Sequence, residues 1–196
     1  LFESAVQEER LLPEALPALK LLLSAYDIPS QNDANENAHQ LLSHYQSGSL
    51  LERGIKKGKT AREVSLDFYK SNIWAFAGHS IATIKAWTKQ LFEMPGGLKS
   101  HLHPGVLELL RGGENHGLVP LAISASSLWS TELAGRYLGI PPRHCRGIRT
   151  TVRAQILTPQ IEAPIPFGEG KVEAIQTICG GLPTLALGDS FEATDK

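Results

Sequence analysis

The sequence predicts an α/β protein with a parallel sheet, because strand-like apolar runs alternate with helical patterns in its second half. The run at residues 119–124 ends in hydroxyl residues and is followed at 130–139 by a helix with a hydroxyl start and a glycine stop. The run at residues 184–189 follows a helix that opens at Gly168. Strands that alternate with helices are typical of βαβ units, whose strands lie parallel.

Between these elements, residues 147–161 alternate polar and apolar side chains. This alternation predicts an antiparallel strand pair, which we place at the edge of the sheet.

The first half of the chain has helical periodicity instead. Its leucines fall on one broad face, which Pro13 and Pro17 divide into short pieces. Thr60 and Glu63 have the spacing of a capping box, and Ser80 has the position of another N-cap. Residues 27–36 are rich in Asn, Asp, Ser and Pro and predict a connection. We therefore divide the chain into a mostly helical domain, residues 1–98, and an α/β domain, residues 99–196.

The composition is that of a globular protein. A chain of 196 residues with 42% hydrophobic residues can bury a core, and a net charge of −1 indicates neither a nucleic-acid nor a membrane partner. Cys145 and Cys179 form neither a Cys-x-x-Cys pair nor a disulfide framework. This cysteine usage fits a reducing compartment, so we expect a cytoplasmic protein.

Three polar residues at predicted strand ends and helix starts indicate a magnesium phosphate site. Ligands of parallel α/β sheets bind outside the carboxyl ends of the strands. The Ser124 hydroxyl and adjacent backbone N–H groups such as that of Ala125 can hold a phosphoryl oxygen. The Asp189 carboxylate suits Mg²⁺, which takes few protein ligands beside phosphate oxygens and waters. Lys171 lies in the first turn of a helix, where a cation costs up to about 1 kcal/mol unless an anion lies nearby.

Each of these residues also has a simpler interpretation. A serine after a strand is usually a turn or cap residue, an isolated lysine is usually solvated, and Asp after Gly usually forms a turn. The order of the three residues favours the functional interpretation.

From His103 onward the chain resembles the haloacid dehalogenase-like hydrolase superfamily, and within it the phosphoserine-phosphatase-like branch. Residues 123–126 are similar to the second motif of this superfamily, residues 170–174 to its third and residues 187–190 to its fourth. The resemblance implies a three-layer Rossmann-like core with a parallel sheet and an inserted all-helical cap domain. Residues 1–98 would form the cap, apart from the first few, which belong to the core.

The resemblance also implies a reaction, the hydrolysis of a small, phosphoserine-like phosphomonoester through an aspartyl-phosphate intermediate. Ser124 and Lys171 would bind the transferring group, and Asp189 would hold Mg²⁺. A second acidic ligand normally follows the first by about four positions. Asp195 is our first choice for that ligand and Glu192 the alternative.

The superfamily's nucleophile lies in an Asp-x-Asp loop, and this sequence contains none. Leu1 and the three residues after it are similar to the residues that commonly follow that loop, so we expect the loop to precede Leu1 and the chain to be a fragment. Two alternatives stay open. One is a catalytically inactive binding or interaction protein, and the other is a metal-independent haloacid dehalogenase, against which Asp189 argues.

Two further patterns are weaker. Residues 54–60 resemble a nucleotide-binding P-loop but have three residues between the glycines instead of four. His101 and His103 have the spacing of metal ligands on a strand, with no third ligand evident. A solvated basic helix start and ordinary loop histidines explain these two patterns better.

Overall fold

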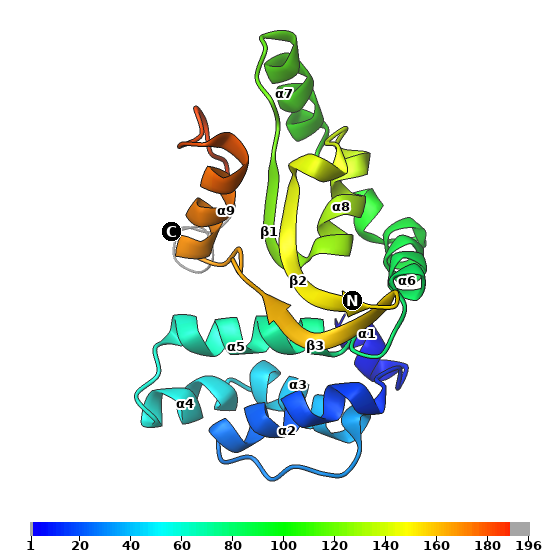
Figure 1. Cartoon of the computed structure of the whole chain (residues 1–196), viewed down its shortest axis with the longest axis vertical. Helices are drawn as coiled ribbons and strands as arrows, with labels where there is room; N and C mark the ends of the chain where they lie inside the picture. Colours follow the sequence, from blue (N-terminus) through cyan, green and yellow to red (C-terminus); the bar gives the residue numbers. More distant parts are fainter. Residues whose placement is uncertain (1, 189–196) are drawn as a thin grey trace.

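The computed structural model describes residues 2–188 and has two regions (Figure 1). Helices α1 to α6 make up the helical region, residues 2–93, and the elements from α7 to α9 make up the sheet region, residues 104–179. Helix α5 runs between the sheet and the helices α2, α3 and α4 (Figure 1). It contacts all three strands on one side and α2 and α4 on the other.

The elements follow one another as the hydrophobic patterns predict, with helices before residue 98 and mixed structure after it. The helices are α1 (Phe2–Gln7), α2 (Leu16–Ala25), α3 (Ala34–Gln46), α4 (Ser49–Lys56), α5 (Ala61–Trp74), α6 (Ile81–Glu93), α7 (Pro104–Asn115), α8 (Leu128–Tyr137) and α9 (Glu169–Cys179). The 3₁₀ helices are η1 (Pro13–Ala15), η2 (Leu98–His101) and η3 (Pro142–His144), and the strands are β1 (Ala122–Ser127), β2 (Cys145–Arg153) and β3 (Ile156–Glu162).

Several predicted helix boundaries are confirmed. Thr60 caps α5, and Ser80 caps α6 by accepting the Thr83 N–H at 3.0 Å. Pro13 begins η1 and Pro17 lies in the first turn of α2. Proline is tolerated there, because backbone N–H groups in the first turn of a helix have no intrahelical acceptor. The predicted connection at residues 27–36 is shorter, because Asp33 caps α3 and the helix begins at Ala34.

The sheet has the order β1-β2-β3. Strands β1 and β2 are parallel, and β2 and β3 are antiparallel, so the predicted antiparallel pair is confirmed. Ala154 and Gln155 connect that pair with positive φ angles of 49° and 67°. The α/β class is therefore confirmed, with a small mixed sheet in residues 2–188.

The strand predicted at residues 119–124 is shifted in the structure. Strand β1 is Ala122–Ser127, so Ser124 lies inside the strand and not at its end. The following helix has Ser127 as its N-cap, because the Ser127 hydroxyl accepts the Ser130 N–H at 3.2 Å. The prediction placed the helix start at Ser130, three residues too late, because both residues are hydroxyl cap formers.

The strand predicted at residues 184–189 is wrong over its described part. Residues 184–188 form no strand, and Leu185 and Leu187 are 59% and 69% exposed instead of buried. A strand needs a neighbour to complete its hydrogen bonds, and no described strand pairs with this segment. Asp189 lies outside the described residues.

The principal core belongs to the helical region. It collects buried side chains from α1 to α6, and from the sheet region it includes Trp129 and Leu157. Helix α7 buries none of its residues. No helix within residues 2–188 has both the length and the apolar character needed to cross a membrane.

Candidate functional site

Helix α5 is fixed at its start by a local hydrogen-bond pair. The Thr60 hydroxyl accepts the Glu63 N–H at 3.2 Å, and the Glu63 carboxylate accepts the Thr60 N–H at 2.7 Å. The Thr60 N–H, and after it the Thr60 hydroxyl, which donates to the same carboxylate at 2.9 Å, lower the pKa of Glu63 below its ordinary value. The predicted capping box is thus confirmed, and it sets where the first turn of α5 begins.

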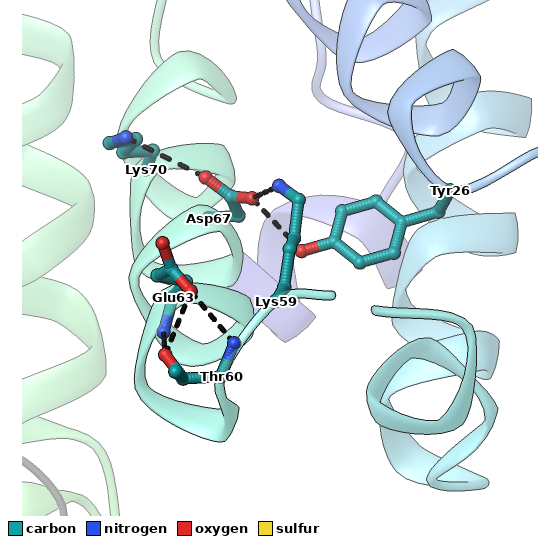
Figure 2. Close-up of polar contacts among 6 residues, drawn as sticks. All are labelled: Tyr26, Lys59, Thr60, Glu63, Asp67 and Lys70. Atoms are coloured by element: carbon teal, nitrogen blue, oxygen red, sulfur yellow. Dashed lines mark hydrogen bonds and ion pairs between the residues drawn. The ribbon is translucent and has the colours of Figure 1, made fainter. Parts of the chain in front are cut away.

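One face of α5 is held to the helical region by Asp67 (Figure 2). Its carboxylate accepts a hydrogen bond from the Tyr26 hydroxyl at 2.9 Å and one from Lys59 Nζ at 2.5 Å, and Lys70 Nζ lies 3.6 Å away. Burial, and then the hydrogen bond to Asp67, raises the pKa of Tyr26 above its ordinary value. Lys59 Nζ also lies 4.8 Å from the centre of the Tyr26 ring. These contacts balance charge inside the protein, so we interpret the network as structural.

The other face of α5 contacts the loop that leads into α9. The Tyr69 ring lies 5.5 Å from the Phe167 ring, centre to centre. Seven residues earlier on the same side of the helix, the guanidinium of Arg62 occupies the space that a Cβ at position 168 would need. Gly168 also has a φ of +54°, which favours glycine. The absence of a side chain therefore lets α5 approach the amino end of α9.

Lys171 lies where the sequence predicts it, in the first turn of α9. Helix α9 packs against β1. The carboxyl end of β1 and the amino end of α9 both point toward α5 (Figure 1). The structure therefore puts the strand of Ser124 beside the helix of Lys171, and the start of α5 next to the start of α9.

Ser124 lies in an irregular part of β1. Ile123 pairs with Arg146 and Ser127 with Ile148, so β1 advances four residues while β2 advances two. A β-bulge of this kind leaves backbone groups of the bulged strand without inter-strand hydrogen bonds, and such bulges are common beside functional sites. The Ser124 hydroxyl accepts the Ser126 N–H at 3.1 Å. That N–H is therefore engaged, and Ser124 keeps its own O–H as a donor for a ligand; Ala125, beside it, is buried.

Strand β1 is at the edge of the described sheet. Its one described neighbour is β2, and no strand within residues 2–188 pairs with its other edge.

The proposed metal ligands Asp189, Glu192 and Asp195 all lie outside the described residues. Within residues 2–188, no cluster of three or more His, Cys, Asp or Glu side chains could hold a metal ion. The donor chemistry of the predicted set still fits Mg²⁺, because carboxylate oxygens are the ligands this ion prefers.

The weaker sequence patterns do not form sites in the described chain. The segment that resembles a P-loop begins inside the last turn of helix α4 and does not follow a strand, and its last residue, Thr60, is the cap of α5. His101 ends η2 and His103 is the residue before α7.

A surface hollow of about 410 Å³ lies beside α4 and Tyr26. Two of its cations are already engaged. Lys57 pairs with Asp27 at 2.8 Å, and Arg53 donates to the carbonyls of Tyr26 and Asp27 at 3.3 and 3.1 Å. The hollow therefore offers little free positive charge to a ligand.

The sequence predicted the capping box of Thr60 and Glu63 but not that Arg62 and Tyr69 face the α/β region. Their spacing of seven residues does place them on one side of a helix, opposite Asp67. Which side meets the sheet depends on packing that the spacing alone does not contain.

Comparison with known proteins supports the fold alone. No protein-family profile and no curated protein matches the chain. Among solved structures, it is similar to one described as a protein with unknown function from Bordetella pertussis Tohama I, with a TM-score of 0.56 and 22% sequence identity. The similarity covers 92% of this chain and 73% of that one.

Proposed function

We propose that this protein is a Mg²⁺-dependent phosphatase of small phosphomonoesters, of the haloacid dehalogenase-like type, in which the helical region acts as a cap. The observation that carries the proposal is the packing of the Lys171 helix against the Ser124 strand, with α5 of the helical region next to the start of that helix. Phosphoryl transfer needs positioning and neutralisation of charge more than it needs covalent chemistry from the protein.

The two described residues have complementary roles in this proposal. The Ser124 hydroxyl accepts the Ser126 N–H and donates its own proton to a phosphoryl oxygen. The Lys171 ammonium, at the amino end of α9, adds positive charge to that of the helix dipole. Together they stabilise the negative charge on the transferring group.

Asp189, with Asp195 or Glu192, would hold Mg²⁺. When bound, the ion neutralises phosphate charge and orients the phosphoryl oxygens.

The aspartyl-phosphate route also requires a carboxylate nucleophile. The resemblance places its strand along the edge of β1 that has no partner within residues 2–188. Residues 1–196 contain no Asp-x-Asp sequence. A test of activity therefore uses the polypeptide expressed from its complete gene.

The experiment measures phosphate release from a panel of small phosphomonoesters with and without Mg²⁺. We expect Mg²⁺-dependent turnover that falls roughly 100-fold or more in Lys171→Ala and in Ser124→Ala, since each change removes a group that stabilises transition-state charge. Asp189→Asn should nearly abolish turnover.

The matched control is Lys85→Ala, which removes an exposed cation from α6 and should leave turnover unchanged. Wild-type rates in both Lys171→Ala and Asp189→Asn would contradict the proposal. Chloride release from a 2-haloacid without Mg²⁺ would indicate the dehalogenase instead.

A further inference from the structure

Ser49 and His44 form a hydrogen-bonded pair where helix α3 ends and helix α4 begins. His44 lies in the last turn of α3, and Ser49 is the first residue of α4. The chain turns sharply between the two helices at Gly48, whose φ of +76° favours glycine. Ser49 Oγ lies 2.5 Å from His44 Nδ1, which is close enough for the hydroxyl to pass its proton to the ring.

The usual role of a serine at a helix start does not explain this contact. Such a serine commonly caps the helix by accepting a backbone N–H. The cap residue of α4 is Gly48, however, and Ser49 lies inside the helix. The His44 carbonyl is 3.4 Å from Ser49 Oγ, so the ring nitrogen is the nearer acceptor for the hydroxyl. When Ser49 donates to Nδ1, the neutral ring carries its own proton on Nε2.

Ser49 lines the surface hollow of about 410 Å³ beside α4. A molecule in this hollow would therefore meet the hydroxyl that contacts His44. The side chains around the hollow include three cations and two carboxylates, and one cation and one carboxylate of these, Lys57 and Asp27, form an ion pair. The hollow therefore has little net charge and suits an uncharged molecule better than an ionic one.

The first turn of α4 supplies hydrogen-bond donors next to Ser49 in the sequence. The first backbone hydrogen bond of this helix runs from the Glu52 N–H to the Gly48 carbonyl at 3.2 Å. The N–H groups of Leu50 and Leu51 thus have no acceptor within the helix. Backbone N–H groups of this kind stabilise the oxyanion that forms when a serine attacks a carbonyl group.

We propose that Ser49 and His44 are a catalytic pair that hydrolyses small uncharged carboxylic esters in this hollow. Helix α5 lies between α4 and the sheet, which carries Ser124 (Figure 1). The pair is therefore separate from the site of the proposed phosphatase, and the inference does not depend on that function.

The reaction has two steps and needs water alone as co-reactant. Ser49 Oγ adds to the ester carbonyl carbon while its proton passes to His44 Nδ1, and the carbonyl electron pair moves to the oxygen. Collapse of this intermediate breaks the bond to the leaving alcohol, which takes the proton from His44. Water then attacks the acyl group on Ser49, with His44 again accepting a proton, and the acid and the free hydroxyl are regenerated.

The kinetic test uses 4-nitrophenyl acetate and the polypeptide expressed from its complete gene. The wild type should release 4-nitrophenol faster than buffer does. Ser49→Ala and His44→Gln should each lower the protein-dependent rate about tenfold or more, because each removes one member of the pair. The matched controls are Ser43→Ala and His39→Gln, which change exposed residues of α3 and should leave the rate unchanged.

A labelling test detects the nucleophile itself. Phenylmethanesulfonyl fluoride reacts with an activated serine hydroxyl, which forms a bond to sulfur and displaces fluoride. The wild type should gain the mass of one phenylmethanesulfonyl group, and peptide mass spectrometry should place that group on Ser49. Ser49→Ala and His44→Gln should not be labelled, whereas the two control variants should be.

A hydrogen bond with a structural role only gives a different pattern. Ser49→Ala would then lower the Tm and leave ester hydrolysis at the wild-type rate, and this outcome would overturn the proposal. A wild type that hydrolyses the ester no faster than buffer, or that carries no label on Ser49, would also overturn it. The labelling result on the wild type decides the matter even where a variant fails to fold.

Discussion

The helical region and the sheet region differ in how they bury apolar side chains. In the helical region, Leu19, Leu23 and Leu41 are fully buried. The Asp67 carboxylate there accepts hydrogen bonds from Tyr26, just after α2, and Lys59, just before α5. In the sheet region, α7 buries no residue, and Leu109 is 49% exposed. The principal core therefore lies mostly in the helical region, and Ser124 and Lys171 lie in the sheet region.

Helix α5 joins the two regions, because it makes contacts with both of them. Its Asp67 face is held by the helical region, and its Arg62 face contacts the loop before α9. The helical region thus holds α5 against the sheet, and the proposed function assigns this region the role of a cap.

Replacing one leucine in each region tests the difference most directly. Leu23→Ala should lower the free energy of unfolding by about 2–5 kcal/mol, because the side chain is fully buried and a cavity would remain. Leu109→Ala in α7 should change it by less than about 0.5 kcal/mol. Urea unfolding curves of the two variants give both values, and similar losses would show that the sheet region packs as tightly as the helical one.

Removing the acceptor of the polar network should have the next largest effect. Asp67→Ala leaves the Tyr26 hydroxyl and Lys59 without their shared partner, and should cost about 1–3 kcal/mol of unfolding free energy. Its counterpart in the sheet is Glu162→Ala, which breaks a pair with Arg149 at 3.0 Å. Both of these side chains are exposed by more than a third, so we expect a cost of about 0–1 kcal/mol. Equal losses of unfolding free energy for Asp67→Ala and Glu162→Ala in chemical denaturation would contradict the expected difference between the two regions.

The Tyr26 hydroxyl gives a smaller, pH-dependent effect. Its pKa is raised in the folded protein, so folding favours the protonated phenol. The resulting stabilisation is fully present below the ordinary pKa of 10.0 and is lost as the pH rises beyond it. Tyr26→Phe should therefore cost about 1.5 kcal/mol near neutral pH and progressively less above pH 10. A difference between the two proteins that stays constant from pH 8 to pH 11 would exclude this role for Tyr26.

Helix caps should affect both regions alike and by a modest amount, because each cap acts locally. Thr60→Ala and Ser127→Ala should each cost about 1 kcal/mol in thermal or urea unfolding. The cost at Thr60 should decrease as the pH falls below about 4.5. The lowered pKa of Glu63 means that its hydrogen bonds stabilise the fold above that pH and are lost once the carboxylate is protonated. An unchanged cost at Thr60 in acid would count against the reciprocal capping box.

Part of the candidate site was predictable from the sequence. Lys171 lies in the first turn of a helix, as predicted, whereas Ser124 lies inside β1 and not at the strand end where it was predicted. The detail around Ser124 was not predictable, because the bulge in β1 depends on its register with β2. The contact between Arg62 and Gly168 was not predictable either, because it joins residues more than one hundred positions apart in different elements.

The sequence by itself determined the features that depend on near neighbours. Thr60 and Glu63 are three residues apart and satisfy each other's backbone groups, so their helix start needs no other part of the chain. Tertiary structure decided whether residues 184–188 form a strand and which face of α5 meets the sheet. A strand exists only with a partner beside it, and a helix turns toward whichever surface buries it, so both outcomes depend on residues distant in the sequence.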